Sequence, residues 1–258
     1  MTKEMLKNIL FQIKKSKKEF SPVFIIGSGR SGTTILGNTL SRHPKIKYLN
    51  ERRDLWHKAY PEFDIWNKDT QDPKLYVDEK DVILKKNNLL HHLFFRKQVL
   101  GNAKILLEKL PINNFRLKFL KESFPNAKYI YLTRNGLEVS KSIGEMIQKQ
   151  NWFTGEKYEL LKKYISDNRI IFRTNINSNL GKGMWEWKLS IDESDCFFKK
   201  ENKDNFIHLS YQDLIKNPLQ VISDIFDFLG LDYTEYWISE ISKNIKRSYS
   251  QKTIARRL

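Results

Sequence analysis

The feature that most constrains the fold is a β-prone run followed at once by a glycine-rich turn and a helical segment. Val23–Ile26 is apolar, the next eight residues read GSGRSGTT (Gly27–Thr34), and a helical pattern continues over Ile35–Leu40. A glycine turn between a strand and a helix is typical of half a parallel βαβ unit. The chain is therefore predicted to be an α/β protein.

Further strands and helices alternate along the chain. Strands are predicted at Ile105–Leu107, Lys128–Thr133 and Phe206–Leu209, with a helix over Leu137–Gln148. A last amphipathic helix begins at Pro218 and ends before Gly230, because proline suits a first helical position and glycine a C-terminal stop. Strands separated by helices predict a central, mostly parallel β-sheet with helices on both faces.

We expect a single domain over residues 1–258, since no repeat or low-complexity linker divides the chain. Residues 1–20 are lysine-rich with a broken apolar pattern, which predicts a basic amphipathic lead-in helix. The stretches 54–103 and 150–183 are aromatic and charged without a clean period. They are interpreted as lid or acceptor-side insertions within that domain.

Composition narrows the classes of partner and compartment. Cys196 is the single cysteine, so an intrachain disulfide and a cysteine-based metal cage are excluded, and a reducing, cytoplasmic location is expected. Apolar runs fall far short of the roughly 18 residues of a membrane span. The net charge of +16 predicts attraction to anions, either through a basic patch or simply as a lysine-rich solvated surface. Familiar nucleic-acid motifs are missing, so no nucleic-acid partner is expected.

The glycine turn has the frame of a phosphate-binding loop. Gly27 and Gly32 occupy the two glycine positions of G-x-x-x-x-G, but Thr33 stands where nucleotide hydrolases have a lysine. Successive amide hydrogens of such a loop, with the start of the following helix, bind one anion. Arg30 lies inside the loop, and no strand ending in a lone aspartate suggests a magnesium partner. We therefore expect an anionic ligand bound without a metal.

Two separated motifs carry a family resemblance. The loop Gly27–Thr34 resembles the 5′-phosphosulfate loop of the PAPS-dependent sulfotransferases, in the R-S-G-T-T form of the tyrosylprotein and bacterial carbohydrate-type members. Tyr129–Arg134, with Ser142 eight residues after the arginine, is similar to that family's 3′-phosphate motif. A turn and about two helical turns bring such a serine back beside the strand end. The stretch Phe124–Lys128, reading FPNAK, also resembles the family pattern.

The resemblance implies the sulfotransferase fold, with a P-loop-like parallel sheet, and PAPS as the co-substrate that leaves as adenosine 3′,5′-bisphosphate. The residues it implies for donor binding are Gly27, Ser28, Gly29, Arg30, Ser31, Gly32, Thr33, Thr34, Arg134 and Ser142, with Arg247, Ser248 and Lys252 contributing from the tail.

Sulfuryl transfer needs a base for the acceptor proton and a cation beside the departing phosphate. A short strand over Ile46–Leu49 would deliver Glu51 to the carboxyl edge of the sheet. The resemblance implies that Glu51 is the general base, and that Lys109 of a K-x-P element acts with Arg30 on the phosphosulfate. Alternative roles are a surface salt bridge for Glu51, with Arg52 or Arg53, and an exposed strand-end position for Lys109.

The predicted acceptor side contains Arg53, which is expected to orient the acceptor, and His57, which is the other candidate base. Trp185 and Trp187 are expected to pack in the core from an amphipathic helix. The function predicted is a metal-independent sulfotransferase acting on a saccharide, a peptide tyrosine, a lipid or a small metabolite. The alternatives are a P-loop kinase of small molecules or nucleosides, and a non-catalytic module that binds anions or nucleic acid.

Overall fold

A central parallel sheet organises the molecule, which was analysed as a computed structural model. The structure describes residues 20–150, 152–168, 170 and 177–254, so the predicted lead-in helix over residues 1–20 lies outside the described residues except for Phe20. Five strands are hydrogen-bonded in the order β2-β3-β1-β4-β5, all parallel. Their bounds are β1 Val23–Ile26, β2 Ile46–Asn50, β3 Ile105–Lys109, β4 Lys128–Thr133 and β5 Phe206–Ser210.

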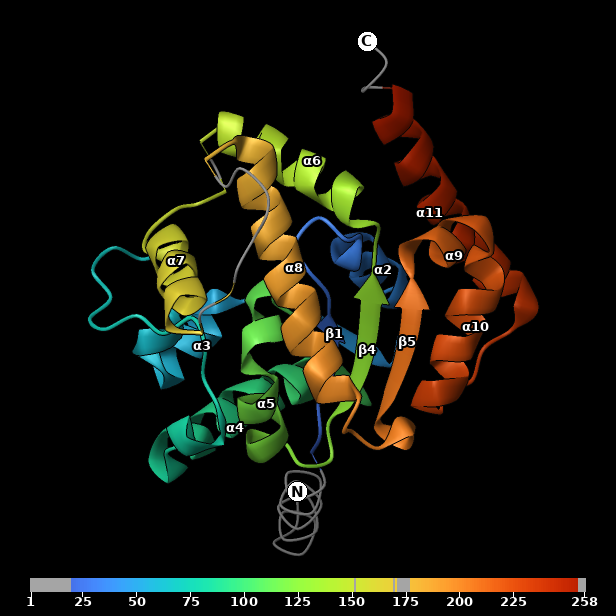
Figure 1. The fold of residues 1–258 in the computed structure, drawn as a ribbon. Helices are drawn as coiled ribbons and strands as arrows, with labels where there is room; N and C mark the ends of the chain where they lie inside the picture. The colour runs from blue at the N-terminus through green and yellow to red at the C-terminus, as the bar shows by residue number, and fades with distance from the viewer. Residues whose placement is uncertain (1–19, 151, 169, 171–176, 255–258) are drawn as a thin grey trace, which may run out of the picture.

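Helices connect the strands and cover both faces of the sheet (Figure 1). The α-helices are α2 Thr33–Leu40, α3 Arg53–Ala59, α4 Leu84–Leu100, α5 Leu117–Ser123, α6 Gly136–Gln148, α7 Lys157–Asp167, α8 Asn179–Phe198, α9 Tyr211–Lys216, α10 Pro218–Leu229 and α11 Glu235–Ile254. Short 3₁₀ turns are η1 Pro61–Phe63, η2 Glu79–Asp81, η3 Pro111–Arg116 and η4 Lys203–Asn205. The α/β class and the parallel sheet predicted from the alternating pattern are confirmed.

Two apolar clusters, one on each face, form the core. Side chains alternate between the faces along each strand, so Phe24 and Ile26 of β1 join one cluster while Val23 and Ile25 join the other. The first cluster is built with α3, α4, α5 and α8, and the second with α2, α9, α10 and α11. Because both faces are covered, the inner strands β1, β3 and β4 are buried almost throughout, whereas the edge strands β2 and β5 are only partly buried.

Several helix boundaries follow the residues that predicted them. Pro218 is the first residue of α10, and Gly230 ends that helix with φ 62°, a left-handed conformation that glycine adopts without strain. Trp185 is buried in the first cluster, which confirms its expected packing role. Its helix is longer than the tryptophan pair suggested, since α8 begins at Asn179.

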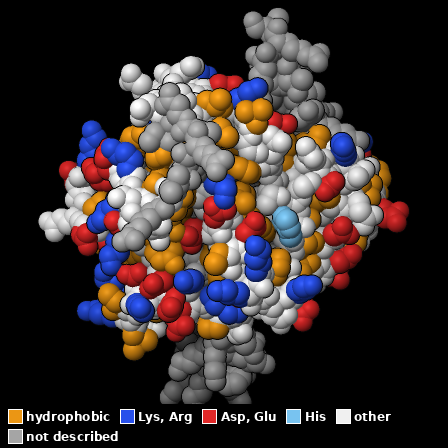
Figure 2. Space-filling view, in the orientation of Figure 1, with side chains coloured by type: hydrophobic (Ala, Val, Ile, Leu, Met, Phe, Trp, Pro, Cys, Tyr) orange, Lys and Arg blue, Asp and Glu red, His pale blue; other side chains and the backbone are white. Residues whose placement is uncertain are grey.

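Charge is distributed over the surface. Figure 2 shows Lys and Arg side chains interspersed with Asp and Glu over the face that it draws, rather than gathered in one basic patch. On this face the arrangement favours the lysine-rich solvated surface over a nucleic-acid patch. Among the residues that the structure describes, none of the helices combines the length and apolarity needed to cross a membrane.

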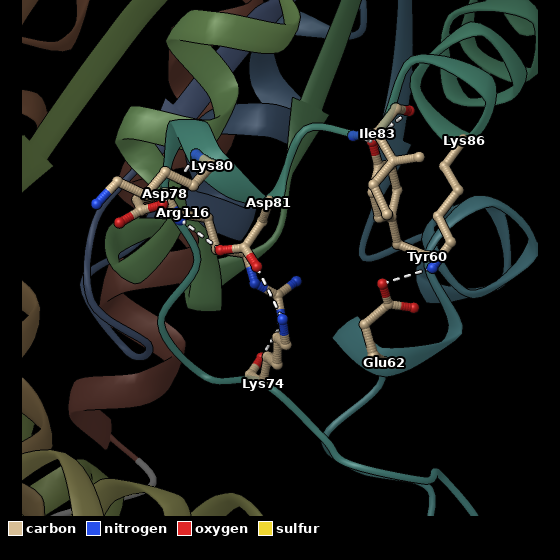
Figure 3. Close-up of polar contacts among 9 residues, drawn as sticks. All are labelled: Tyr60, Glu62, Lys74, Asp78, Lys80, Asp81, Ile83, Lys86 and Arg116. Carbon is tan, nitrogen blue, oxygen red and sulfur yellow. Dashed lines mark hydrogen bonds and ion pairs between the residues drawn. The ribbon is translucent and has the colours of Figure 1, made fainter.

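The segment after α3 is hydrogen-bonded to η3, the turn that follows the strand carrying Lys109. Arg116 in η3 is fully buried, and its Nη2 donates to the carbonyl oxygen of Phe63 at 2.7 Å. The same nitrogen donates to the carbonyl oxygen of Lys74 at 3.4 Å (Figure 3). Lys74 Nζ in turn pairs with Asp81 at 2.8 Å. The aromatic stretch 54–103 therefore packs onto the sheet through η3, and its place on the acceptor side stays a prediction.

Candidate functional site

The glycine loop has the conformation of an anion-binding turn. Gly32 has φ 97° and Arg30 has φ 70°, so the backbone adopts a positive φ at two positions between β1 and α2. The turn is closed by two hydrogen bonds between Ser28 and Ser31. The amide of Ser31 donates to the carbonyl of Ser28 at 3.2 Å, and the two side-chain hydroxyls are hydrogen-bonded at 2.6 Å. α2 has no side-chain cap at Gly32 and no acidic residue in its first turn. Its first amides are therefore suited to an external anion.

Gly27 is required by the approach of a neighbouring strand. A Cβ at this position would lie 2.5 Å from the carbonyl oxygen of Leu132 in β4. The carbonyl of Gly27 accepts a 3.1 Å hydrogen bond from Asn114 Nδ2, and Asn114 Oδ1 accepts one from Ser194 Oγ at 3.0 Å. Sequence reasoning missed Asn114. The available signal was an amide side chain three residues after the K-x-P element and five residues beyond the end of β3.

The two predicted donor motifs meet in space. Arg30 Nε donates to Ser142 Oγ at 3.0 Å, although 112 residues separate them, and Arg134 Nη1 donates to the carbonyl of Arg30 at 3.0 Å. The guanidinium of Arg134 also pairs with Glu138 at 2.7 Å and lies 4.3 Å from the ring centroid of Tyr211. Arg134 and Ser142 therefore stand beside the loop, at the end of β4 and on α6, as their spacing predicted.

Glu51 and Lys109 form an ion pair at the carboxyl edge of the sheet. The Lys109 side chain is 1% exposed and that of Glu51 is 44% exposed. Lys109 Nζ also donates to Thr34 Oγ1 at 3.0 Å, and the amide of Glu51 donates to the carbonyl of Lys109 at 2.9 Å. Glu51 has φ 51°, a conformation uncommon for a residue with a Cβ. The pair is thus joined to the first turn of α2.

This geometry corrects two alternatives. Glu51 is partnered by Lys109, whereas Arg52 pairs with Asp54 at 2.7 Å. An exposed strand-end position for Lys109 is wrong, because the side chain is buried. A buried ammonium needs a partner close by, and the Glu51 carboxylate provides it.

Glu108 is a buried carboxyl that sequence reasoning missed. It precedes Lys109 on β3, points to the other face of the sheet, and accepts hydrogen bonds from Trp56 Nε1 at 3.1 Å and Asn113 Nδ2 at 2.9 Å. Burial raises the pKa of Glu108 to about 8, against the opposing effects of the Trp56 hydrogen bond and the charges of Lys109 and Arg116. The sequence signal that could have revealed this buried carboxyl was an acidic residue at the end of an apolar strand.

The two predicted acceptor-side residues lie in the helix that follows Glu51. The Arg53 guanidinium lies 4.7 Å from the ring centroid of Trp66, and His57 Nδ1 lies 3.6 Å from Asp64 Oδ2. Within the described residues, neither side chain is hydrogen-bonded to the Glu51–Lys109 pair. The tail residues Arg247, Ser248 and Lys252 fall in α11, where the structure describes the backbone only, so their side chains lie outside the described residues.

Comparison with known proteins gives the family. The model of the sulfotransferase family matches residues 22–235, and the chain belongs to that family. It is 23% identical over 222 residues to protein-tyrosine sulfotransferase 2 of Gallus gallus, covering 84% of this chain and 53% of that protein. It is 24% identical over 225 residues to protein-tyrosine sulfotransferase A of Caenorhabditis elegans, covering 83% and 50%. The chain spans about half the length of these relatives.

Solved structures share the fold. The sulfotransferase domain from the Synechococcus PCC 7002 olefin synthase aligns with a TM-score of 0.55 at 19% identity, covering 84% of this chain and 75% of that chain. The sulfotransferase domain from the curacin biosynthetic pathway aligns with a TM-score of 0.52 at 20% identity, covering 83% and 75%. The sulfotransferase fold expected from the two motifs is confirmed.

Proposed function

We propose that the chain transfers a sulfuryl group from PAPS to a hydroxyl or amine of an acceptor by in-line displacement. The observation that carries the proposal is the contact of buried Lys109 with both Thr34, at the start of α2, and Glu51. A cation for the departing phosphate and a carboxylate for the acceptor proton thus stand together beside the loop. Family membership supports the same reaction and does not favour the kinase alternative.

The donor is proposed to bind along the carboxyl edge from the loop to α6. The loop amides and the start of α2 suit its 5′-phosphosulfate, because they present hydrogen-bond donors that no side chain caps. Arg30 is hydrogen-bonded to Ser142 through its side chain and to Arg134 through its backbone carbonyl, and the three residues offer two cations and a hydroxyl to the phosphates of the donor. In the free protein these groups hold each other in place, which lowers the cost of ordering them around the donor.

In the proposed chemistry Glu51 acts on the acceptor and Lys109 acts on the departing phosphate. The Glu51 carboxylate accepts the proton of the acceptor hydroxyl as its oxygen forms a bond to sulfur. The bond between sulfur and the bridging phosphate oxygen breaks, and the Lys109 ammonium stabilises the negative charge left on that oxygen. Lys109 is held by Thr34 as well as Glu51, so it can remain beside the phosphate when Glu51 turns to the acceptor.

The test is transfer from radiolabelled PAPS to pools of saccharides, phenols, peptides and lipids, with the parent and two variants. Glu51→Gln and Lys109→Ala are each expected to lower kcat by about a hundredfold or more, the usual contribution of a general base for Glu51 and of a charge-stabilising group for Lys109. Adenosine 3′,5′-bisphosphate should still raise the melting temperature of Glu51→Gln, because Glu51 does not contact the donor in this proposal.

Matched controls remove ion-paired residues of the same types elsewhere. Lys121 and Glu201, which pair with each other at 2.9 Å, lie outside the site. Glu201→Gln and Lys121→Ala should keep parental turnover. Full activity in Glu51→Gln would remove the general-base role, and no transfer to any pool by the parent would favour the non-catalytic anion-binding module.

The acceptor class and the cytoplasmic location stay predictions. The net charge of +16 favours an acceptor that carries negative charge. The same transfer screen, run with acidic and neutral members of each pool, identifies the class directly.

A further inference from the structure

An indole ring lies directly against the middle of the donor loop. A Cβ built on Gly29 would stand 2.5 Å from Cη2 and 2.7 Å from Cζ2 of Trp152, and its three nearest atoms all belong to that ring. Gly29 itself does not have a positive φ. The residue is therefore kept small by Trp152 and not by the conformation of the loop.

Trp152 is held in place by buried charges from two helices. Its Nε1 donates to Glu186 Oε2 at 2.5 Å, and Lys157 Nζ donates to Glu186 Oε1 at 2.6 Å. Both Glu186 and Lys157 are buried, and Lys157 Nζ also lies 4.3 Å from the centroid of the Trp152 ring. Moving the indole away from the loop would leave one oxygen of a buried carboxylate without a partner, which is costly.

Trp187, which follows Glu186 in α8, packs in a similar way against the turn after β4 that contains Arg134. Trp187 Nε1 donates to the carbonyl of Arg134 at 3.2 Å. A Cβ on Gly136 would lie 2.6 Å from the Trp187 ring. Adjacent residues of one helix, Glu186 and Trp187, thus support both the loop at Gly29 and the turn after β4.

We propose that Trp152 is a positioning residue for the donor loop, held against Gly29 by the buried Glu186–Lys157 pair, and that it contributes to the affinity for the donor. This inference rests on the proposed function for the identity of the ligand. Trp152 belongs to the stretch 150–183 interpreted as an acceptor-side insertion, so the contact couples that stretch to the donor loop. The indole acts through the loop backbone and takes no part in proton or sulfuryl transfer.

The test is a double-mutant cycle read by calorimetric titration with adenosine 3′,5′-bisphosphate. Gly29→Ala should weaken binding about tenfold or more, because the new methyl group displaces the loop from a ring that cannot retreat. Trp152→Ala should weaken it by only a few-fold, since the loop loses a packing surface but keeps its amides. The double variant should bind as well as Trp152→Ala and better than Gly29→Ala, because the methyl group then has room.

Gly27 supplies the matched control. Its Cβ would meet the backbone of Leu132, so truncating Trp152 cannot relieve Gly27→Ala. The double variant of Gly27→Ala with Trp152→Ala should bind at least as weakly as Gly27→Ala alone. In turnover assays Trp152→Phe should raise KM for the donor and leave kcat unchanged, because a phenyl ring still covers Gly29 but cannot donate to Glu186.

The outcomes separate this inference from the proposed function. The positioning role would be overturned if the double variant of Gly29→Ala with Trp152→Ala bound the bisphosphate no better than Gly29→Ala. It would also be overturned if Trp152→Ala restored binding to Gly27→Ala. A parent that binds no bisphosphate would instead reject the proposed donor. In that case the contact between Gly29 and Trp152 is tested by melting temperature. The fall in melting temperature of the double variant should be smaller than the sum of the falls caused by Gly29→Ala and Trp152→Ala. Additive falls would overturn the positioning role.

Discussion

Replacing Glu108 by glutamine should make the protein more stable than the parent as the pH rises. The Glu108 carboxyl is fully buried on β3, and burial raises its pKa from an ordinary value of 4.5 to about 8. Glutamine has the same shape and no proton to lose. Asn113 Oδ1 is buried without a partner, so a rotated Asn113 amide can accept a hydrogen bond from the new side chain.

The sign follows from proton binding in the two states. Below pH 4.5, Glu108 is protonated in both the folded and the unfolded chain. Between that value and its raised folded pKa of about 8, only the unfolded chain has lost the proton, so the parent loses stability as pH rises. At 1.36 kcal/mol per pH unit the interval corresponds to roughly 5 kcal/mol, an upper figure for the gain of Glu108→Gln.

The assay is urea unfolding of parent and variant at a series of pH values from about 5 to about 9. The free-energy difference between Glu108→Gln and parent should grow steadily in favour of the variant and level off at the alkaline end. Glu122, which is exposed at the end of α5, supplies the matched control variant Glu122→Gln, whose unfolding free energy should stay within about 0.5 kcal/mol of the parent value. A flat or falling curve for Glu108→Gln would refute the assignment of a raised pKa to this carboxyl.

Three further outcomes follow from the loop and its supports. Gly32→Ala should abolish bisphosphate binding and lower the unfolding free energy by at least about 1–2 kcal/mol, since Gly32 has φ 97° and its Cβ would lie 2.4 Å from Tyr211; calorimetry and urea titration check this. Ser142→Ala should raise the donor KM about tenfold with kcat unchanged, and an equal loss of both would contradict a binding role. Asn114→Ala should cost about 1–3 kcal/mol in urea unfolding, by removing the hydrogen bond to Gly27; an unchanged midpoint would contradict this.

Features set by local sequence were predictable. The apolar runs of β1 and β4 are buried on both faces, and the glycine turn between β1 and α2 needs the positive φ of Gly32, so pattern alone located them. Arg134 and Ser142 were found through the family resemblance, and their spacing has a physical reason in helical geometry. Glu51 was placed by the short strand before it, since parallel strands end at one edge of the sheet.

Features that depend on distant partners were not predictable. Glu186 and Trp152 are 34 residues apart, and Asn114 meets Gly27 across 87 residues. Nothing local distinguishes a buried glutamate with a lysine partner from a solvated one on a helix. The burial of Lys109 likewise depends on how β2 and α2 close around the end of β3, and this is why an exposed lysine remained an alternative until the structure was known.

The central claim is that the turn after β1 binds a sulfated nucleotide through its amides and Arg30. Its most direct measurement is the melting temperature of the parent protein in a chelating buffer with adenosine 3′,5′-bisphosphate, compared with ATP and magnesium. The account predicts a clear rise with the bisphosphate that Arg30→Ala largely removes, and a much smaller rise with ATP and magnesium. An equal or larger rise with ATP and magnesium, or a bisphosphate effect indifferent to Arg30, would contradict it.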